Sequence, residues 1–124
     1  MPRSLIGTVS TFEYNDFSSL WRLLAGEEYG VVKMEVSRSK GPDDVVLTAV
    51  RELCDHHGVI LIFDECTSRF RETFGGFHLK FEVEPDMVIF GNALGNGYAI
   101  TAVIGKTPVM QAAQEAFISG TFFD

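Results

Sequence analysis

The chain has 124 residues, 46% of them hydrophobic, and a formal net charge of -7 at pH 7. Its length limits it to about one ordinary domain, and its apolar content excludes a disordered chain, because burial of those residues offsets the entropy cost of folding. The negative charge, without any run of Lys or Arg, removes the usual electrostatic basis for binding nucleic acid or an anionic membrane, so we expect neither partner.

The first half of the chain reads as helix, strand and helix. Asn15 is expected to cap a helix that ends at Gly26, and "YGVVKMEV" (29–36) is typical of a strand. The turn "KGPDD" then leads into a predicted helix over 43–57, which Gly58 ends. Two sets of apolar residues repeat at helical spacing in these helices: Phe17, Leu20, Trp21 and Leu24, and then Val45, Val46, Ala49, Val50, Leu53 and Cys54.

The second half adds three strands and a last helix. "VILIF" (59–63) and "DMVIF" (86–90) lack polar alternation, which is typical of strands covered on both faces. "ITAVI" (100–104) follows after nine residues, 91–99, whereas a parallel return needs about a dozen or more. We therefore expect an α/β fold with a mostly parallel sheet and one antiparallel strand. Thr107 and Pro108 are expected to cap a helix through about Phe117.

Asp64 and Glu65 come directly after the strand 59–63, at the carboxyl edge where open α/β sheets bind ligands. One alternative is a solvated loop start. Another is the magnesium-binding acid of a P-loop nucleotidase, but "GKT" (105–107) has Ile100 where the phosphate loop needs its first glycine. A third is that Asp64 keeps the ring nitrogen of a heteroaromatic cofactor protonated.

Two segments, "LIFDECTSRFR" and "PDMVIFGNALGNGYAITAVIG", resemble the core of the class III pyridoxal-phosphate aminotransferases, in particular the glutamate-1-semialdehyde 2,1-aminomutase-like branch. That family reads D-E-V-x-T-G-F-R, then P-D, an apolar strand and G-K-A-L-G-G-G-Y. The similarity extends through "EYNDFSSL", "MEVSRSKGP" and "ISGTFF". It implies that residues 1–124 form a single segment of a fold type I large domain, and that the flanking parts of a complete family member are absent.

The resemblance also implies the site. It makes Asp64 the partner of the pyridine nitrogen and places Cys66 against the cofactor ring. It also implies that Thr121 binds the phosphate of the neighbouring subunit's cofactor. The glycine-rich run 91–97 would let the backbone approach the cofactor closely. The implied cofactor is pyridoxal 5'-phosphate, the implied assembly is a homodimer, and the implied substrate is a small molecule of amino-acid or amino-sugar type.

Two positions depart from the family pattern. Arg69 stands where the family has glycine, and Asn92, which lies 28 residues after Asp64, stands where the family has the lysine that forms the Schiff base. An amide is neither nucleophilic nor basic. Lys106 is not a substitute, because a strand of five residues carries it roughly 17 Å toward the opposite edge of the sheet. We therefore expect no catalytic residue and an inactive chain.

Three alternatives follow from these departures. The chain is an incompetent core segment, a non-enzymatic module that associates with a full-length relative, or a gene fragment without a selected function. Because a sheet taken from a larger domain loses cover on its edges and one face, we expect marginal stability and a tendency to associate.

Other candidate residues are expected to be structural. The "DHH" run (55–57) closes a helix, where histidines meet the negative end of the dipole, and His78 lacks a second ligand at metal spacing, so we expect no metal. Glu35 matches a family acid near the site or simply ends a strand. Cys54 and Cys66 are expected to be reduced thiols. No apolar window or signal-peptide pattern indicates export or membrane insertion, so a cytoplasmic location is expected.

Overall fold

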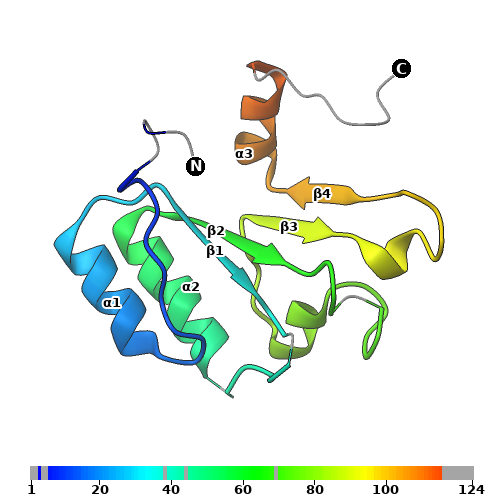
Figure 1. Cartoon of the computed structure of the whole chain (residues 1–124), viewed down its shortest axis with the longest axis horizontal. Coiled ribbons are helices and arrows are strands. Elements are labelled where there is room, and N and C mark those ends of the chain that lie inside the picture. Colours follow the sequence, from blue (N-terminus) through cyan, green and yellow to red (C-terminus); the bar gives the residue numbers. More distant parts are fainter. Residues whose placement is uncertain (1–2, 4–5, 38, 44, 69, 116–124) are drawn as a thin grey trace.

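The computed structural model describes residues 3, 6–37, 39–43, 45–68 and 70–115. In these ranges the chain forms a 4-stranded sheet in the order β1-β2-β3-β4, with two longer helices packed beside β1 and β2 (Figure 1). The helices are α1 (Phe17–Gly26), α2 (Val46–His57) and the short α3 (Thr107–Gln111). The strands are β1 (Val31–Glu35), β2 (Ile60–Asp64), β3 (Met87–Phe90) and β4 (Ala102–Gly105). The 3-10 helices are η2 (Phe77–Phe81), η3 (Asn92–Leu94) and η4 (Ala112–Glu115).

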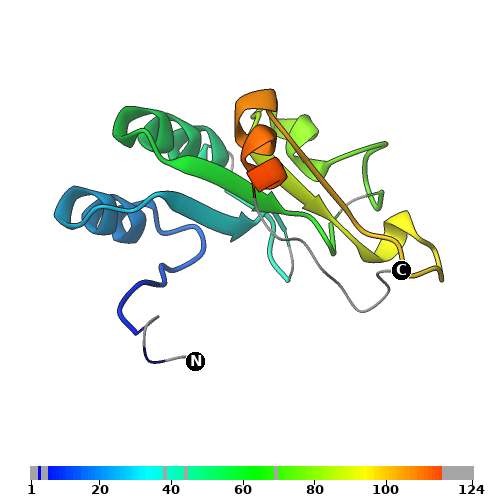
Figure 2. The ribbon, with the colours of Figure 1, turned by 90° about the horizontal axis from the view of Figure 1, so that it is seen from above.

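The sheet has the predicted topology. β1 pairs with β2, and β2 with β3, in parallel, whereas β4 runs antiparallel to β3 with Met87 opposite Gly105. The expected α/β fold with one antiparallel strand is therefore confirmed. Both views place α3 on the β4 side of the sheet, away from α1 (Figure 2).

Each strand begins one or two residues later than predicted, and the starts of the three α-helices also differ from the prediction. Asn15 is not the cap of α1: its φ is +63°, and its side chain bonds the backbone of Gly41 and Asp43, while the Asp16 carboxylate accepts the Ser19 N–H at 3.2 Å. The left-handed backbone at Asn15 makes a turn and brings Asp16 to the cap position.

The second helix starts three residues later than predicted, because the Asp43 carbonyl accepts the Val46 N–H at 3.0 Å in a turn that precedes it. Its predicted end at Gly58 is confirmed, with φ +65°. At the last helix Lys106, rather than Thr107, is the cap residue, and Pro108 lies in the first turn as expected. That helix continues as η4, and residues 116 and 117 lie outside the described ranges.

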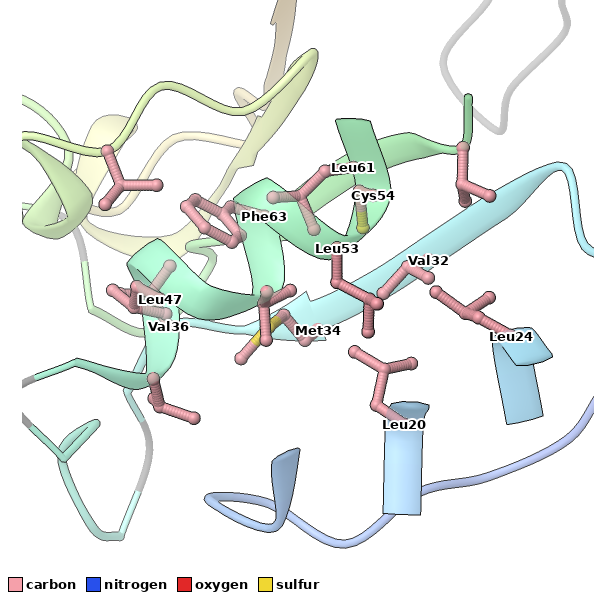
Figure 3. Close-up of a cluster of buried hydrophobic side chains, with 14 of the residues drawn as sticks. Leu20, Leu24, Val32, Met34, Val36, Leu47, Leu53, Cys54, Leu61 and Phe63 are labelled. Carbon is pink, nitrogen blue, oxygen red and sulfur yellow. The ribbon is translucent and has the colours of Figure 1, made fainter. Parts of the chain in front are cut away.

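One hydrophobic core lies between the helices and the sheet (Figure 3). It joins Leu20 and Leu24 of α1, Leu47 and Leu53 of α2, and alternate residues of the strands: Val32, Met34, Leu61 and Phe63. Cys54 lies inside this core and Cys66 outside it, both as free thiols. Burial raises the pKa of the Cys54 thiol to about 11.

The opposite face of the sheet is much more open. The residues between the core positions of each strand are exposed or half-buried: Val31, Lys33, Ile60, Ile62, Met87 and Ile89. The register adds Val103 of β4 to this face, since Val103 lies opposite Ile89. We call it the open face. None of the helices in the described ranges has the length and apolarity that a bilayer crossing requires.

Asp86, just before β3, ties three elements together. Its Oδ2 accepts the Leu61 N–H of β2 and Nη1 of Arg51 in α2, both at 2.8 Å, and its Oδ1 pairs with Nζ of Lys106 at 2.8 Å. Burial raises the pKa of this carboxyl, but the hydrogen bonds and the two cations outweigh burial and bring the pKa to about 2. Lys106 thus lies at the amino end of β3, away from Asp64, as expected.

We expect Asp86→Asn to lower the free energy of unfolding by about 2 kcal/mol at pH 7. A carboxyl with a depressed folded pKa stabilises the fold above its unfolded pKa, near 3.8, and loses that contribution as the pH falls toward about 2. Urea denaturation of both proteins between pH 7 and pH 3 should show the difference shrinking below about pH 4. The control is Asp55→Asn, since Asp55 pairs with the same Arg51 but is exposed. Equal losses in the two variants would contradict this role of Asp86.

Candidate active site

The candidate site lies where the parallel strands end. Glu35 at the end of β1 is opposite Asp64 at the end of β2, and Asp64 is opposite Ile89 of β3. Successive side chains of a strand point to opposite faces, so Asp64 belongs to the open face, while Glu65 points into the interior. Two adjacent acids therefore have different surroundings.

Asp64 is held as an ionised carboxylate. Its Oδ1 accepts the Cys66 N–H at 3.1 Å, and its Oδ2 lies 2.9 Å from Nζ of Lys33. Burial raises the pKa of Asp64, but the bonds from Lys33 and Cys66 outweigh it, so the pKa lies below its usual range. The sequence prediction did not include Lys33, although the alternation in "VVKME" places it on the same face as Glu35.

Cys66 connects the end of β2 to the glycine-rich loop. A Cβ at Gly91 would lie 3.0 Å from Sγ of Cys66, so only glycine fits there without a shift. The Glu65 N–H donates to the Ile89 carbonyl at 2.8 Å, which holds the two segments together just before this contact. The structure thus brings Asp64, Cys66 and the start of the loop side by side.

Asn92 is exposed at the start of η3, directly after the buried Gly91. Its φ is +37°, a backbone conformation that Asn tolerates better than most residues. The loop is tight beyond it, since a Cβ at Gly95 would overlap the Tyr98 carbonyl oxygen. Arg69 and Thr121 lie outside the described residues. The roles of Asp64, Cys66, Asn92 and Thr121 toward a cofactor stay predictions.

The expectation for Glu65 is wrong. Its side chain neither faces the ligand edge of the sheet nor lies in a solvated loop. It is fully buried and accepts bonds from four donors: the Ser68 hydroxyl at 3.1 Å, the Phe77 N–H, the His78 N–H at 3.0 Å and Nδ1–H of the His78 ring. His78 is therefore a packing residue, as expected. Sequence reasoning missed the pair itself, since its members are 13 positions apart with no shared periodicity.

The surroundings of Glu65 hold it ionised. Burial raises the pKa of the carboxyl, but the bonds from the His78 ring and from the backbone N–H groups of His78 and Phe77 outweigh it, and the pKa is lowered. This carboxylate therefore fixes the start of the connection from β2 to η2.

The other described histidines are those that end α2. His56 and His57 are exposed in the last turn of α2, with their rings 5.1 Å apart, as expected of a helix end. Within the part of the chain that the structure describes, no group of His, Cys, Asp and Glu is arranged to hold a metal ion.

Comparison with known proteins gives one family. A family model described as aminotransferase class-III matches residues 40–123. The 3-aminobutyryl-CoA aminotransferase of Cloacimonas acidaminovorans is 39% identical over 99% of this chain and 32% of its own length. The glutamate-1-semialdehyde 2,1-aminomutase of Nitratidesulfovibrio vulgaris is 35% identical over 90% of this chain and 28% of its own length.

Solved structures agree with these sequence matches. The FumI protein of a Sphingopyxis species, described as a PLP internal aldimine form, superimposes with a TM-score of 0.85 at 25% identity. The match covers 92% of this chain and 30% of that one. This chain thus spans about a third of the length of the relatives that it matches.

We expect Glu65→Gln to lower the free energy of unfolding by roughly 2–4 kcal/mol, because an amide cannot accept all the buried donors that now face the carboxylate. Glu65 has a lowered pKa, so its contribution is present above the ordinary carboxyl pKa and is lost as the pH falls through the folded value.

The matched control is Glu72→Gln, because Glu72 forms an exposed pair with Lys80, and we expect a change within about 0.5 kcal/mol. Denaturant unfolding at pH 7 compares the variants. If both change stability equally, the buried carboxylate does not hold this connection.

Proposed function

The chain belongs to the class-III aminotransferase family, and from this membership we propose that it is a pyridoxal-phosphate-binding core segment of an aminotransferase large domain that does not catalyse the reaction by itself. Residues 1–124 would form a single segment of that domain. One observation carries the proposal: Asp64, for which we propose the role of the cofactor acid, is a paired carboxylate at the end of β2, while the loop after β3 has Asn92 where the family pattern has its lysine.

The residues fit the ring of the cofactor. When bound, pyridoxal phosphate withdraws electrons from an attached amino compound, and it does so best with its pyridine nitrogen protonated. Asp64 is an ionised, partly buried carboxylate that would hold such a nitrogen. Cys66 would lie beside the ring, the loop 91–97 would approach it closely, and Thr121 would bind the phosphate of the neighbouring subunit's cofactor.

The residues do not fit covalent attachment and proton transfer. The Asn92 amide has no basic lone pair, so it cannot form the bond that the family lysine forms or carry a proton during the reaction. Lys106 cannot replace it, because its ammonium pairs with Asp86 at the other end of β3. We therefore infer that catalysis by this chain is absent.

The family also suggests substrates, assembly and location. Relatives named for 3-aminobutyryl-CoA and glutamate-1-semialdehyde support a small amino-bearing compound of amino-acid type as the ancestral substrate. From the sequence we also propose an amino sugar as the alternative type of substrate, a homodimer as the assembly, and the cytoplasm as the location.

The open face supports a second candidate, a non-enzymatic module that associates with a full-length relative. Val31 and Val103 on this face are about half exposed, and β1 and β4 are the two edges of the described sheet. Exposed apolar surface beside free strand edges favours association.

We expect Asn92→Lys to form a covalent adduct with pyridoxal phosphate at position 92 that borohydride traps, because an amine replaces an amide where the family pattern has its lysine. Peptide mass spectrometry after reduction measures the adduct. We expect no amino transfer by the wild type. Detection of pyridoxal-phosphate-dependent transamination by the wild-type chain would overturn the proposed incompetence.

The matched control is Asn96→Lys, since Asn96 is exposed in the same loop and also has a positive φ, +43°. Adduct at position 96 should stay at the level of other exposed lysines, whereas adduct at position 92 should fall when Asp64→Asn is added. Equal labelling at 92 and 96 would mean that the loop does not place residue 92 at a cofactor site.

We expect the chain to self-associate with rising concentration, and Val103→Glu to weaken this association, because it places a charge on the open face. Sedimentation velocity over a range of concentrations measures it. Val45→Glu is the control, since Val45 is exposed at the start of α2. A compact monomer at every concentration would contradict this prediction.

A further inference from the structure

Lys33 lies on the open face of β1, close to Asp64 of the neighbouring strand. In β1 the core side is formed by Val32 and Met34, and the pleat therefore turns Lys33 to the open face. The β1–β2 register sets Lys33 opposite Ile62, two residues before Asp64 on the same face, so Lys33 reaches the acid diagonally. Its Nζ lies 2.9 Å from Oδ2 of Asp64.

Each oxygen of the Asp64 carboxylate already has a partner among the described residues. Oδ1 accepts the Cys66 N–H, and Oδ2 faces the Lys33 ammonium. A protonated pyridine nitrogen needs the same carboxylate and brings the same charge as Lys33. Two cations can share one carboxylate, as Arg51 and Lys106 do at Asp86, but their mutual repulsion weakens the binding of each, so Lys33 and the ring nitrogen compete for Asp64.

We propose that Lys33 is the resident counter-ion of Asp64 and weakens the binding of a cationic ring nitrogen there, so that a pyridine-type ligand binds more tightly when Lys33 moves away. This inference rests on the proposed function, since it concerns the same acid. Lys33 is thus a positioning residue of the site, acting through Asp64. Its side chain is 54% exposed and that of Asp64 only 19%, so Lys33 is the partner that is free to move into solvent.

Lys33 does not replace the family lysine in this arrangement. In pyridoxal phosphate the carbonyl carbon lies across the ring from the nitrogen, so one ammonium cannot hold Asp64 and react with that carbon together. The bond to Asp64 and the charges of Asp64 and Glu35 also raise the pKa of Lys33, which keeps it protonated and without a nucleophilic lone pair.

The test uses 4-deoxypyridoxine 5'-phosphate, which has the pyridine nitrogen and the phosphate but no carbonyl, so that no lysine adduct forms. Calorimetry at fixed pH and salt compares wild type with Lys33→Met. We expect Lys33→Met to bind about fivefold more tightly, the size that a partly exposed ion pair supports, and Lys33→Arg to bind as the wild type does. Adding Asp64→Asn to Lys33→Met should remove the gain.

The matched control is Lys106→Met. Lys106 pairs with Asp86 at 2.8 Å, with 49% and 15% of the two side chains exposed, which closely resembles the Lys33 pair at the other end of the sheet. Affinity should not change in this variant. An equal gain in Lys106→Met, or a gain in Lys33→Met that persists with Asp64→Asn, would overturn the inference.

A second measurement needs no ligand. In an NMR pH titration, the Asp64 pKa should rise in Lys33→Met relative to wild type, and an unchanged pKa would overturn the counter-ion role. If the pKa rises but no variant binds the pyridine phosphate, the proposed function fails together with the competition at Asp64, while the ion pair stands. If wild type and Lys33→Met bind the pyridine phosphate with equal affinity, and Asp64→Asn weakens that binding, only the inference about Lys33 fails.

Discussion

The buried carboxylate of Glu65 is the constraint on which the candidate site depends. It collects the hydroxyl of Ser68, two backbone N–H groups and the His78 ring, and so fixes how the chain leaves β2. Cys66 follows at once, and its contact with Gly91 brings the glycine-rich loop against the end of the strand. If the carboxylate lost its partners, a charge would be buried without compensation, which is strongly destabilising.

The pleat of β2 separates two consecutive acids into two functions. Glu65 points into the core and stabilises the fold, whereas Asp64 points to the open face and keeps its charge at the surface edge. Asp86 repeats the structural function at the other end of the sheet, where it links α2, β2 and the start of α3. The two lysine–aspartate pairs thus stand at opposite ends of the strands, and for this reason Lys106 has no access to the chemistry around Asp64.

Asn92 suits the backbone of its loop but not the reaction of the family. The turn around it is built for close approach, with Gly91 packed on Cys66 and a left-handed backbone at Asn92 itself. An asparagine suits that conformation better than a lysine does, since its short polar side chain tolerates positive φ. The loop geometry is thus compatible with the residue present, while the reaction that the family performs requires an amine at the same position.

The sequence by itself determined the elements and their order. Apolar periodicity gave the helices and strands, Gly58 gave the end of α2, and the short connection 91–99 gave the antiparallel β4, because each depends on neighbours along the chain. The resemblance further identified Asp64 and Asn92 as the informative positions. Only the tertiary structure decided that Asp16 rather than Asn15 caps α1, that Glu65 is buried against His78, and that Lys33 pairs with Asp64. The pairs Glu65–His78 and Lys33–Asp64 join separate segments and depend on burial and strand register, which no local pattern encodes. Asp16 becomes the cap because the Asn15 side chain is bonded to the distant backbone of Gly41 and Asp43.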